Sequence, residues 1–366
     1  MKVGIVGCGF VTQSMHLPNL IELIGRENIS LCDISKDLLE KVSKKYGISS
    51  THATEEDLVT RRDIDAVMIC TPDALHFAGA MNALKEGKHV FVEKPLCLAS
   101  RDSSRLIETA KESNLILQVG YNKRFNPGYM AGKQEFQGMK DIILIRVHNL
   151  VDNRRIAKEL YQIETGTVPE EAGAAISKET ERQIQLELGD VDALAREAYL
   201  FLMFVTSHHL DALRDIFGDP AAVLHTNVWK VREKVNLISA LQYPNGARCN
   251  IESGQTERKF RDEEICAYSP DETVRLIWAN PFIKNAPAIL RVQRGDSNIT
   301  DIHITASYED SFKLQLIDFL QCVKKRRAPK VTGEDGAKVI TIANAIVQSF
   351  CKKRNVLIET GETIGQ

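Results

Sequence analysis

The sequence has no excess of charge of either sign. Its 366 residues carry a formal net charge of −2, although 26% of them are charged. Proteins that bind nucleic acid or an anionic membrane through charge present a strongly basic face or segment. The sequence therefore gives no electrostatic reason to predict a nucleic-acid or membrane partner.

Long apolar segments, internal repeats and low-complexity tracts are also missing. No apolar run approaches the roughly 18–20 residues that a membrane-spanning helix requires. The first seven residues lead directly into a strand pattern, without the charged region and cleavage site of a signal peptide. With 43% hydrophobic residues the composition is that of a globular protein. The length allows about two domains.

Paired cysteines and clusters of metal ligands are absent from the sequence as well. The eight cysteines are scattered, and no two have Cys-x-x-Cys spacing, so neither a zinc ribbon nor a redox pair is predicted. No His, Cys and Asp residues cluster with ligand spacing, and we predict no bound metal. Free cysteines in apolar strands behave as small hydrophobic residues. This usage suits a reducing compartment, and we expect a cytoplasmic protein.

A glycine-rich turn follows the first predicted strand, residues 2–7. It reads Gly7-Cys-Gly9-Phe-Val-Thr12, with Thr12 where the dinucleotide fingerprint has its third glycine. Gly7 permits the tight turn and Gly9 lets a pyrophosphate approach the backbone. The helix N-terminus that follows favours phosphate. The turn therefore predicts a dinucleotide site.

Asp33 ends the second predicted strand, residues 29–32. An acidic residue about 20 positions past the glycines would bind the ribose hydroxyls and repel a 2′-phosphate, which favours NAD over NADP. The alternative is that Asp33 caps the predicted helix 35–46, and both roles are compatible.

Strands alternate with helices through the first third of the chain. Further strands are predicted at 65–70, 89–94 and 115–120, and helices at 74–84 and 100–113. This order predicts a parallel sheet with crossover helices. The near-continuous apolar strands fit burial on both faces of such a sheet.

The strand that ends in Val-Phe-Val-Glu93-Lys94-Pro95 carries the main candidate for chemistry. Pro95 fixes its own φ and biases Lys94 toward an extended backbone. A lysine at the carboxyl end of a strand lies where α/β sheets bind ligands. The alternative is an ordinary surface lysine at a strand end.

Four motifs together resemble the glucose–fructose oxidoreductase/inositol dehydrogenase/MocA (Gfo/Idh/MocA) family, in the family's order and at similar spacing. They are Gly7-x-Gly9, Cys70-Thr-Pro72 followed by His76, Glu93-Lys94-Pro95, and Gly120-Tyr-Asn-Lys-Arg124-Phe-Asn-Pro127. The resemblance covers residues 1–150 well and resumes from about 206. It implies an α/β fold with a Rossmann domain at 1–120 and an α+β domain with an open, mostly antiparallel sheet at 121–366. The substrate would lie between the domains, against the nicotinamide.

The resemblance also implies which residues hold the ligands. Those expected near the pyrophosphate are Gly7, Gly9, Phe10 and Val11, with Asp33 at the adenosine ribose. Those expected along the rest of the cofactor are Thr71, Pro72, His76, Glu93, Lys94 and Asn122. Tyr121 and Arg124 are expected near the substrate at the domain junction, although Arg124 could equally form a structural ion pair.

A second motif, Phe204-Val-Thr-Ser-His208-His209-Leu-Asp211, resembles the family's Asp-x-Gly-x-His-x-x-Asp helix. His208 falls on the family's catalytic histidine, and Asp211 on an aspartate that is expected to be structural. Phe204 replaces the first aspartate, which would orient the substrate and tune the Lys–His pair. His209 could substitute in part and contact the substrate. Because adjacent helical side chains diverge, we expect only one of the two histidines to be catalytic.

Residues 151–204 depart from the family's layout and are predicted to form a helical insertion. Thr180 with Gln183 resembles a capping box. Apolar residues recur at helical spacing at Ile184, Leu188, Val191, Leu194 and Ala198. An added helix that covers the sheet is the simpler interpretation, and a lid or subunit contact is the alternative. Further on, β-rich runs from 221 to about 304 fit a meander, closed by helices at 308–325 and 336–351.

Together these features predict an NAD-dependent oxidoreductase. Oxidation of an alcohol requires a base, and burial together with the charge of oxidised nicotinamide would lower a lysine pKa enough for Lys94 to serve. His208 would take or relay the proton. The expected substrate is a secondary hydroxyl or ketone of a sugar, glycoside or cyclitol, and the family's habits suggest a homo-oligomer through the C-terminal sheet. Two alternatives stay open: a glycoside hydrolase or lyase that oxidises the sugar transiently at C3 with tightly held NAD, and a nicotinamide-binding protein without turnover.

Overall fold

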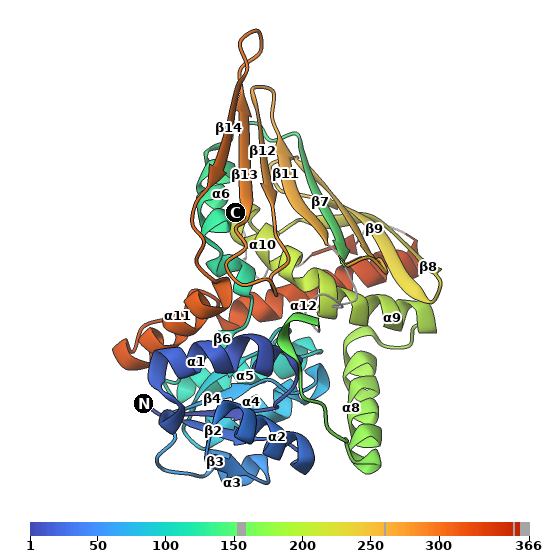
Figure 1. Cartoon of the computed structure of the whole chain (residues 1–366). Helices are drawn as coiled ribbons and strands as arrows, with labels where there is room; N and C mark the ends of the chain where they lie inside the picture. Colours follow the sequence, from blue (N-terminus) through green and yellow to red (C-terminus); the bar gives the residue numbers. More distant parts are fainter. Residues whose placement is uncertain (152–158, 260, 354–355, 359–366) are drawn as a thin grey trace. The chain divides into compact units, whose positions relative to one another are not determined.

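The chain forms two compact units, each built from separate segments (Figure 1). The computed structural model describes residues 1–151, 159–259, 261–353 and 356–358. The first unit contains Met1–Asn122, Ala157–Gly189 and Phe312–Ile340; the second contains Lys123–Ile156, Asp190–Ser311 and Thr341–Gln366. The domain bounds 1–120 and 121–366 stay a prediction. The two units show which residues pack together, but they do not show which segments fold as separate domains.

A six-stranded parallel sheet forms the centre of the first unit. Its strand order is β3-β2-β1-β4-β5-β6, the order of a doubly wound dinucleotide-binding sheet. The strands are β1 (Val3–Val6), β2 (Ile29–Cys32), β3 (Ser50–His52), β4 (Ala66–Ile69), β5 (His89–Val92) and β6 (Leu117–Val119). This confirms the predicted Rossmann fold. The short strand β3 was not predicted, because its three residues are polar and carry no apolar signal.

Helices follow the strands of this sheet as crossover connections. They are η1, a π-helical turn (Thr12–His16), α1 (Leu17–Ile24), η2 (Arg26–Asn28), α2 (Lys36–Tyr46), α3 (Glu55–Val59), η3 (Asp73–Leu75), α4 (His76–Lys85) and α5 (Ser100–Glu112). The unit also contains α8 (Glu170–Leu188) and most of α11 (Ser311–Lys325), which come after the last strand of the sheet. Every residue of β1, β2, β4 and β5 is buried, as expected for a parallel sheet that is covered on both faces. Leu316 and Phe319 of α11 belong to the same core as β1 and α1, so the apolar stripe on this helix is core.

The second unit contains a nine-stranded mixed sheet in the order β14-β13-β12-β11-β7-β10-β9-β8-β15. Its strands are β7 (Leu144–Val151), β8 (Ala222–Val231), β9 (Lys234–Gln242), β10 (Arg248–Gln255), β11 (Asp262–Tyr268), β12 (Glu272–Ile277), β13 (Ile289–Arg294), β14 (Thr300–Thr305) and β15 (Val356–Leu357). Only β7 and β10 pair in parallel. The expectation of an open, mostly antiparallel sheet is therefore confirmed. The simple meander is wrong, because β7 lies between β10 and β11 and separates two antiparallel runs.

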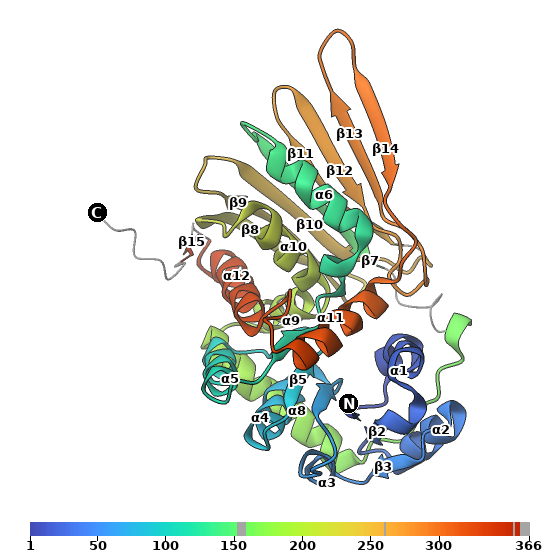
Figure 2. The same ribbon diagram turned by 90° about the vertical axis from the view of Figure 1, so that its left-hand side faces the viewer.

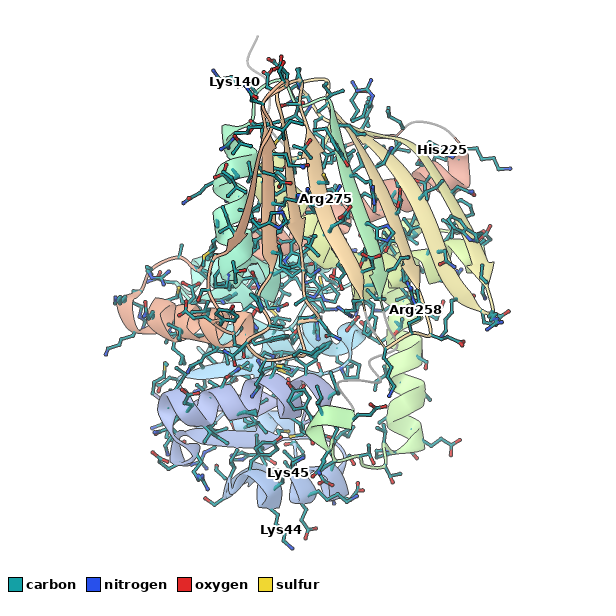
Figure 3. All side chains as sticks on the ribbon, turned by 45° about the horizontal axis from the view of Figure 1, so that its top comes forward. Lys44, Lys45, Lys140, His225, Arg258 and Arg275 are labelled. Carbon is teal, nitrogen blue, oxygen red and sulfur yellow. The ribbon has the colours of Figure 1, made fainter. Side chains whose placement is uncertain are left out.

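One face of this sheet is covered by helices, and the strands also carry charged residues together with exposed hydrophobic residues such as Trp229, Ile238 and Ile289. The helices of the unit are η4 (Asn122–Phe125), α6 (Pro127–Gly138), α9 (Ala193–Phe201), η5 (Leu202–Thr206), α10 (Ser207–Phe217) and α12 (Gly333–Lys352), which begins in the first unit. Figure 2 shows α6 and α10 along the covered face. On the strands, Arg146 and Arg275 both form ion pairs with Glu264. Arg275 is labelled in Figure 3. The apolar/polar alternation along β7 follows from this asymmetry.

In the described part of the predicted insertion, α8 and α9 are separate helices rather than one added helix. Gly189, with φ of +72°, ends α8, and the side chain of Asp192 accepts a hydrogen bond from Ala195 N at the start of α9. The predicted capping box is wrong: Thr180 lies inside α8, where its Oγ1 donates to Ile176 O at 2.8 Å. α8 belongs to the first unit, where Gln183 bonds to Ala74 and Leu98. α9 packs on β8 and β9 of the nine-stranded sheet, as expected for an added helix that covers the sheet. Within the described ranges, no helix combines the length and apolarity needed to cross a lipid bilayer.

Candidate active site

The glycine turn joins β1 to a helix at the carboxyl edge of the parallel sheet. Gly7 has a φ of +99°, and a Cβ on it would lie 2.5 Å from Cys70 O, so only glycine fits. Its N–H donates to Cys32 O at 2.9 Å. Thr12 Oγ1 donates to Gly7 O at 2.7 Å. The threonine that replaces the third glycine of the fingerprint therefore ties the helix back to the turn.

The other half of the turn is open. Gly9 is exposed, and a Cβ built on it meets no atom of the described residues within 4 Å. Phe10 and Val11 are half-buried and begin the helix that follows. An exposed glycine backbone before a helix N-terminus is what a pyrophosphate group needs, so these residues fit a dinucleotide.

Asp33 is fixed by two backbone hydrogen bonds rather than by capping α2. Its Oδ2 accepts from Cys8 N at 2.7 Å, and its Oδ1 accepts from Ser35 N at 2.8 Å. The N-cap of α2 is Ser35, so the capping role suggested for Asp33 is wrong. The carboxylate thus lies directly beside the glycine turn, where a ribose-binding aspartate is expected.

His76 connects two loops that leave the carboxyl edge of the sheet. The ring is buried; its Nδ1 lies 2.6 Å from Pro95 O and its Nε2 lies 2.9 Å from Thr71 O. Pro72 follows Thr71 in the loop after β4. It is exposed and is the N-cap of η3. The predicted group Thr71, Pro72 and His76 is therefore brought together beside the segment that carries Lys94.

Glu93 has a buried partner that was not predicted from the sequence. His16 Nε2 lies 2.7 Å from Glu93 Oε1, and Lys94 N donates to Glu93 Oε2 at 3.1 Å. Burial would raise the pKa of Glu93, but the hydrogen bond from His16 and the positive charges around it outweigh burial and lower the pKa. Because an ionised carboxylate only accepts, the Nε2 of His16 carries the hydrogen. No short-range motif identifies His16, a single histidine in an apolar helix.

Lys94 is the second residue after β5 at the carboxyl edge and is half-buried. Its peptide bond to Pro95 is cis. A Cβ on Gly120 would lie 3.2 Å from the Cα of Glu93, so the end of β6 packs closely beside this segment. Tyr121 and Asn122, which come next, are also buried in the first unit.

The two adjacent histidines of the second unit have different surroundings. His208 is half-buried, whereas the side chain of His209 is 1% exposed. His209 Nε2 lies 3.2 Å from Lys123 Nζ, and its ring stands edge-on to Trp278 with centroids 5.3 Å apart. Phe204, at the position of the family's aspartate, is 42% exposed. The two rings therefore have different surroundings, and the expectation that only one of them is catalytic stays a prediction.

Lys123 stands inside the Gly-Tyr-Asn-Lys-Arg motif, yet it was not among the predicted site residues. It forms a buried ion pair with Glu263 and lies 4.3 Å from the ring centroid of Trp278. Burial lowers the pKa of Lys123 to about 8, although Glu263 opposes this shift. Burial also lowers the pKa of His209 well below its usual range, and Lys123 adds to that shift. His209 is therefore neutral and accepts a hydrogen bond from the ammonium group.

Arg124 is engaged by two aspartates within the second unit. Its Nη1 lies 3.2 Å from Asp211 Oδ1 and its Nη2 lies 2.7 Å from Asp215 Oδ1. Tyr129 and Lys133 bind Asp215 as well. The structure thus contains the structural ion pair that was the alternative for Arg124, while substrate roles for Arg124, Tyr121 and His209 stay predictions. Among the residues described, no group of three His, Cys, Asp or Glu side chains is arranged to hold a metal ion.

Two family models match the chain. One, described as an oxidoreductase family with an NAD-binding Rossmann fold, matches residues 1–121. The other, described as the C-terminal alpha/beta domain of the oxidoreductase family, matches residues 287–358. The chain belongs to the Gfo/Idh/MocA oxidoreductase family. It is an oxidoreductase with an NAD-binding Rossmann unit, which confirms the family, the enzyme class and the cofactor expected from the sequence.

Curated relatives match the chain over nearly its whole length. The myo-inositol 2-dehydrogenase of Thermotoga maritima is 24% identical over 374 residues, which is 100% of both chains. The scyllo-inositol 2-dehydrogenase (NAD(+)) of Bacillus subtilis is 24% identical over 92% of this chain and 90% of its own. A solved structure of levoglucosan dehydrogenase with NADH and L-sorbose has a TM-score of 0.75 at 16% identity, covering 98% of this chain and 99% of that chain. At this identity the solved structure supports the fold.

Proposed function

We propose that the protein oxidises a secondary hydroxyl of a cyclitol or sugar with NAD, or reduces the matching ketone, and that Lys94 and His208 are the acid–base groups. The observation that carries the proposal is the position of Lys94, which leaves β5 at the carboxyl edge beside the ionised carboxylate of Glu93. The inositol dehydrogenases that align with the whole chain support a cyclitol as the first substrate to test.

NAD, when bound, accepts or returns the hydride. The residues that would hold it fall into two groups along the carboxyl edge. Gly7, Gly9, Phe10, Val11 and Asp33 would hold its adenosine diphosphate half, and Thr71, Pro72, His76, Glu93 and Asn122 would line the rest. The exposed backbone at Gly9 and the anchored Asp33 carboxylate fit the first group.

Lys94 would withdraw the proton from the substrate hydroxyl, or return it during reduction. Its amine is half-buried, so it is in part removed from water and also accessible to a small molecule. The Glu93 carboxylate is held by His16 and therefore keeps its charge, which stabilises a protonated lysine nearby. His208, half-buried on α10, would exchange the proton with solvent.

The test is turnover of inositols, sugars and glycosides with NAD⁺ and NADP⁺, followed by the absorbance of the reduced nicotinamide. Lys94→Ala is expected to lower kcat on the order of 10²–10⁴-fold, the range for general acid–base catalysis. Lys85→Ala is the control, because this exposed lysine ends α4 at the opposite edge of the sheet. Unchanged turnover by Lys94→Ala would remove the catalytic assignment.

The same assay separates the open alternatives. Cleavage of a glycoside without accumulation of NADH would indicate a hydrolase or lyase, and tight NAD binding without any turnover would indicate a non-catalytic protein. The homo-oligomer through the nine-stranded sheet also remains a proposal, and the mass of the protein in solution, measured by light scattering, tests it.

A further inference from the structure

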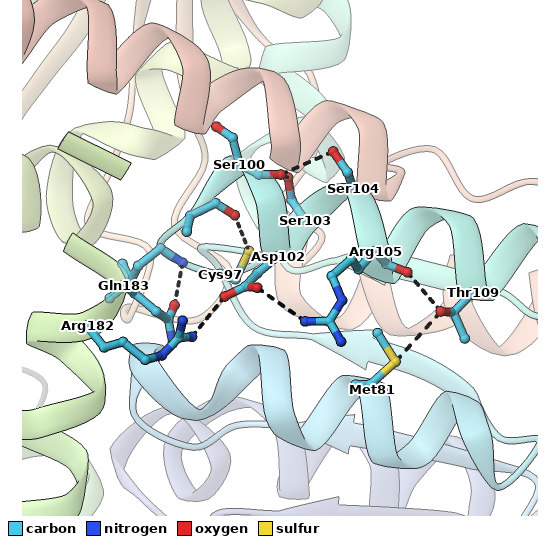
Figure 4. Close-up of polar contacts among 12 residues, drawn as sticks. Met81, Cys97, Ser100, Asp102, Ser103, Ser104, Arg105, Thr109, Arg182 and Gln183 are labelled. Atoms are coloured by element: carbon cyan, nitrogen blue, oxygen red, sulfur yellow. Dashed lines mark hydrogen bonds and ion pairs between the residues drawn. The ribbon is translucent and has the colours of Figure 1, made fainter. Parts of the chain in front are cut away.

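Helix α8, in the predicted insertion, contacts the rest of the first unit through a buried glutamine. The side chain of Gln183 is fully buried. Its Nε2 donates to Ala74 O at 2.7 Å and to Glu179 Oε1 at 2.8 Å. Its Oε1 accepts from Leu98 N at 3.1 Å, and Figure 4 shows Gln183 next to the start of α5. Both hydrogens and the oxygen of the carboxamide are therefore used.

The two backbone groups that Gln183 joins belong to the two loops at the candidate site. Ala74 lies between Thr71 and His76, in the loop after β4, and Leu98 lies four residues after Lys94, in the segment after β5. His76 links the same two loops through the carbonyl oxygens of Thr71 and Pro95. Gln183 thus forms a second link between the loop of Thr71 and the segment of Lys94, and this link comes from outside the sheet.

Two neighbours of Gln183 on α8 continue the contact along the same segment. Glu187 accepts hydrogen bonds from Ser100 N at 2.6 Å and from Ser100 Oγ at 3.0 Å, at the start of α5. Arg182 Nη2 lies 3.1 Å from Asp102 Oδ2, a carboxylate that is buried in the first turn of that helix (Figure 4). The chain that follows Lys94 is therefore held by α8 at three successive points.

Only a carboxamide can make the central link. The link needs a donor for the carbonyl oxygen of Ala74 and an acceptor for the N–H of Leu98 on the same short side chain. Leucine has neither a donor nor an acceptor. Glutamate accepts but does not donate when ionised, and here it would also lie beside Glu179. Ala74 and Leu98 are both buried, so their backbone groups have no easy access to water once the link is removed.

We propose that Gln183 is a positioning residue for Lys94. It sets the separation between the loop of Thr71–His76 and the segment of Lys94, and α8 serves as the rigid support for this link. The proposal rests on the proposed function, since it requires that Lys94 takes part in proton transfer. Displacement of a catalytic group by about 1 Å costs up to about 10²-fold in rate.

The experiment compares Gln183→Leu, Gln183→Glu and Gln185→Leu in the full-length enzyme. Gln185 is exposed on the same helix and serves as the matched control. Gln183→Leu is expected to lower kcat about 10- to 100-fold and to shift the limb of the pH–rate profile that Lys94 controls. Gln183→Glu, which keeps the acceptor for Leu98 N, is expected to lie between wild type and Gln183→Leu. Gln185→Leu is expected to match wild type.

A second readout does not depend on turnover. Hydrogen exchange at the amide of Leu98 is expected to accelerate strongly in Gln183→Leu, less in Gln183→Glu, which keeps the acceptor, and not in Gln185→Leu, and NAD affinity by calorimetry is expected to fall in the same order. A folded Gln183→Leu with wild-type kcat, pH profile and Leu98 exchange would overturn the proposal. Should Gln183→Leu not fold, Gln183→Glu decides by the same criteria, and failure of both to fold would assign Gln183 to folding instead.

The two proposals can fail separately. If Lys94→Ala keeps full turnover, the proposed function fails, whatever the Gln183 variants show. If Lys94→Ala loses turnover while the Gln183 variants behave like Gln185→Leu, only the positioning role is wrong.

Discussion

The two units hold buried charge in different ways. In the first unit Glu93 binds His16, lies next to the half-buried Lys94, and stands at the open carboxyl edge of a parallel sheet. In the second unit the ion pair of Lys123 and Glu263 is closed off: their side chains are 4% and 1% exposed, respectively. Glutamate and lysine side chains therefore lie at the carboxyl edge of the sheet in one unit and form a buried ion pair in the other.

The difference follows from what surrounds each pair. Lys123 is sealed by the ring of Trp278 and by His209, so its ammonium reaches only protein groups. Taking such a pair out of water is costly, and the pair is stable only while both partners and their hydrogen bonds are present. The carboxyl edge has the exposed Gly9 instead, where the backbone is accessible to a ligand. The comparison teaches that a shifted lysine pKa alone does not identify a catalytic lysine.

The largest expected effect is on the buried cluster of Lys123, Glu263, His209 and Trp278, called the closed cluster below. Lys123→Met removes one of the two cations that pair with the buried Glu263 and leaves only Arg261, whose Nη1 lies 2.8 Å from Glu263 Oε1. It is expected to lower the free energy of unfolding by about 3 kcal/mol, the low end for breaking a buried ion pair. Lys133→Met is the control, because Lys133 is 29% exposed and its partner Asp215 keeps Arg124. Its expected cost is about 0–1 kcal/mol. Denaturant unfolding measures both, and equal losses would contradict the distinction between closed and exposed pairs.

A second prediction concerns acid pH. Nearby positive charges, chiefly that of Lys123, outweigh burial and lower the pKa of Glu263 from 4.5 to about 2. Between these values the unfolded chain binds a proton that the folded chain does not, so stability rises with pH there. The contribution, about 3 kcal/mol, is complete above pH 4.5 and is lost as the pH falls toward 2. The difference in unfolding free energy between wild type and Glu263→Gln should shrink over this window, and a constant difference would contradict the assignment.

The smallest expected effect is at the carboxyl edge of the parallel sheet, near Asp33. Residues 161–167 lie against α2: Lys45 (labelled in Figure 3) donates to Gln162 O at 2.5 Å, and Lys41 to Thr165 O at 2.9 Å. A Cβ on Gly166 would lie 2.5 Å from Leu38 Cβ and 2.4 Å from Ser35 Oγ, two residues past Asp33. Gly166→Ala must therefore displace this segment and is expected to cost about 1 kcal/mol.

The effect of Gly166→Ala on NAD affinity distinguishes the carboxyl edge of the parallel sheet from the closed cluster. Because the displaced segment lies beside the adenosine-binding end, we expect NAD affinity to fall several-fold, measured by calorimetry. Gly173→Ala is the matched control, since a Cβ there meets no described atom within 4 Å. A loss of stability in Gly166→Ala with unchanged NAD affinity would show that residues 161–167 support α2 alone.

Local patterns predicted the elements and positions that depend on neighbouring residues. The Gly7 turn, the strand before Lys94 and the core stripe of α11 are all where the spacing indicated. The capping box at Thr180 failed, because Thr and Gln three residues apart also occur inside a helix. The signal that could have found Lys123 was its place in the Gly-Tyr-Asn-Lys-Arg motif, which drew attention to Arg124 instead.

The chain by itself determined the alternation of strands and helices, the glycine turn and the lysine at the end of β5, because each depends on residues within one turn or strand. Tertiary structure alone decided which charged groups meet. His16 and Glu93 are 77 residues apart, and Lys123 and Glu263 are 140 residues apart. It also placed α8 against the loops beside Lys94. The physical reason is that burial and pairing of a charge depend on every element packed around it, and no spacing along the chain encodes those neighbours.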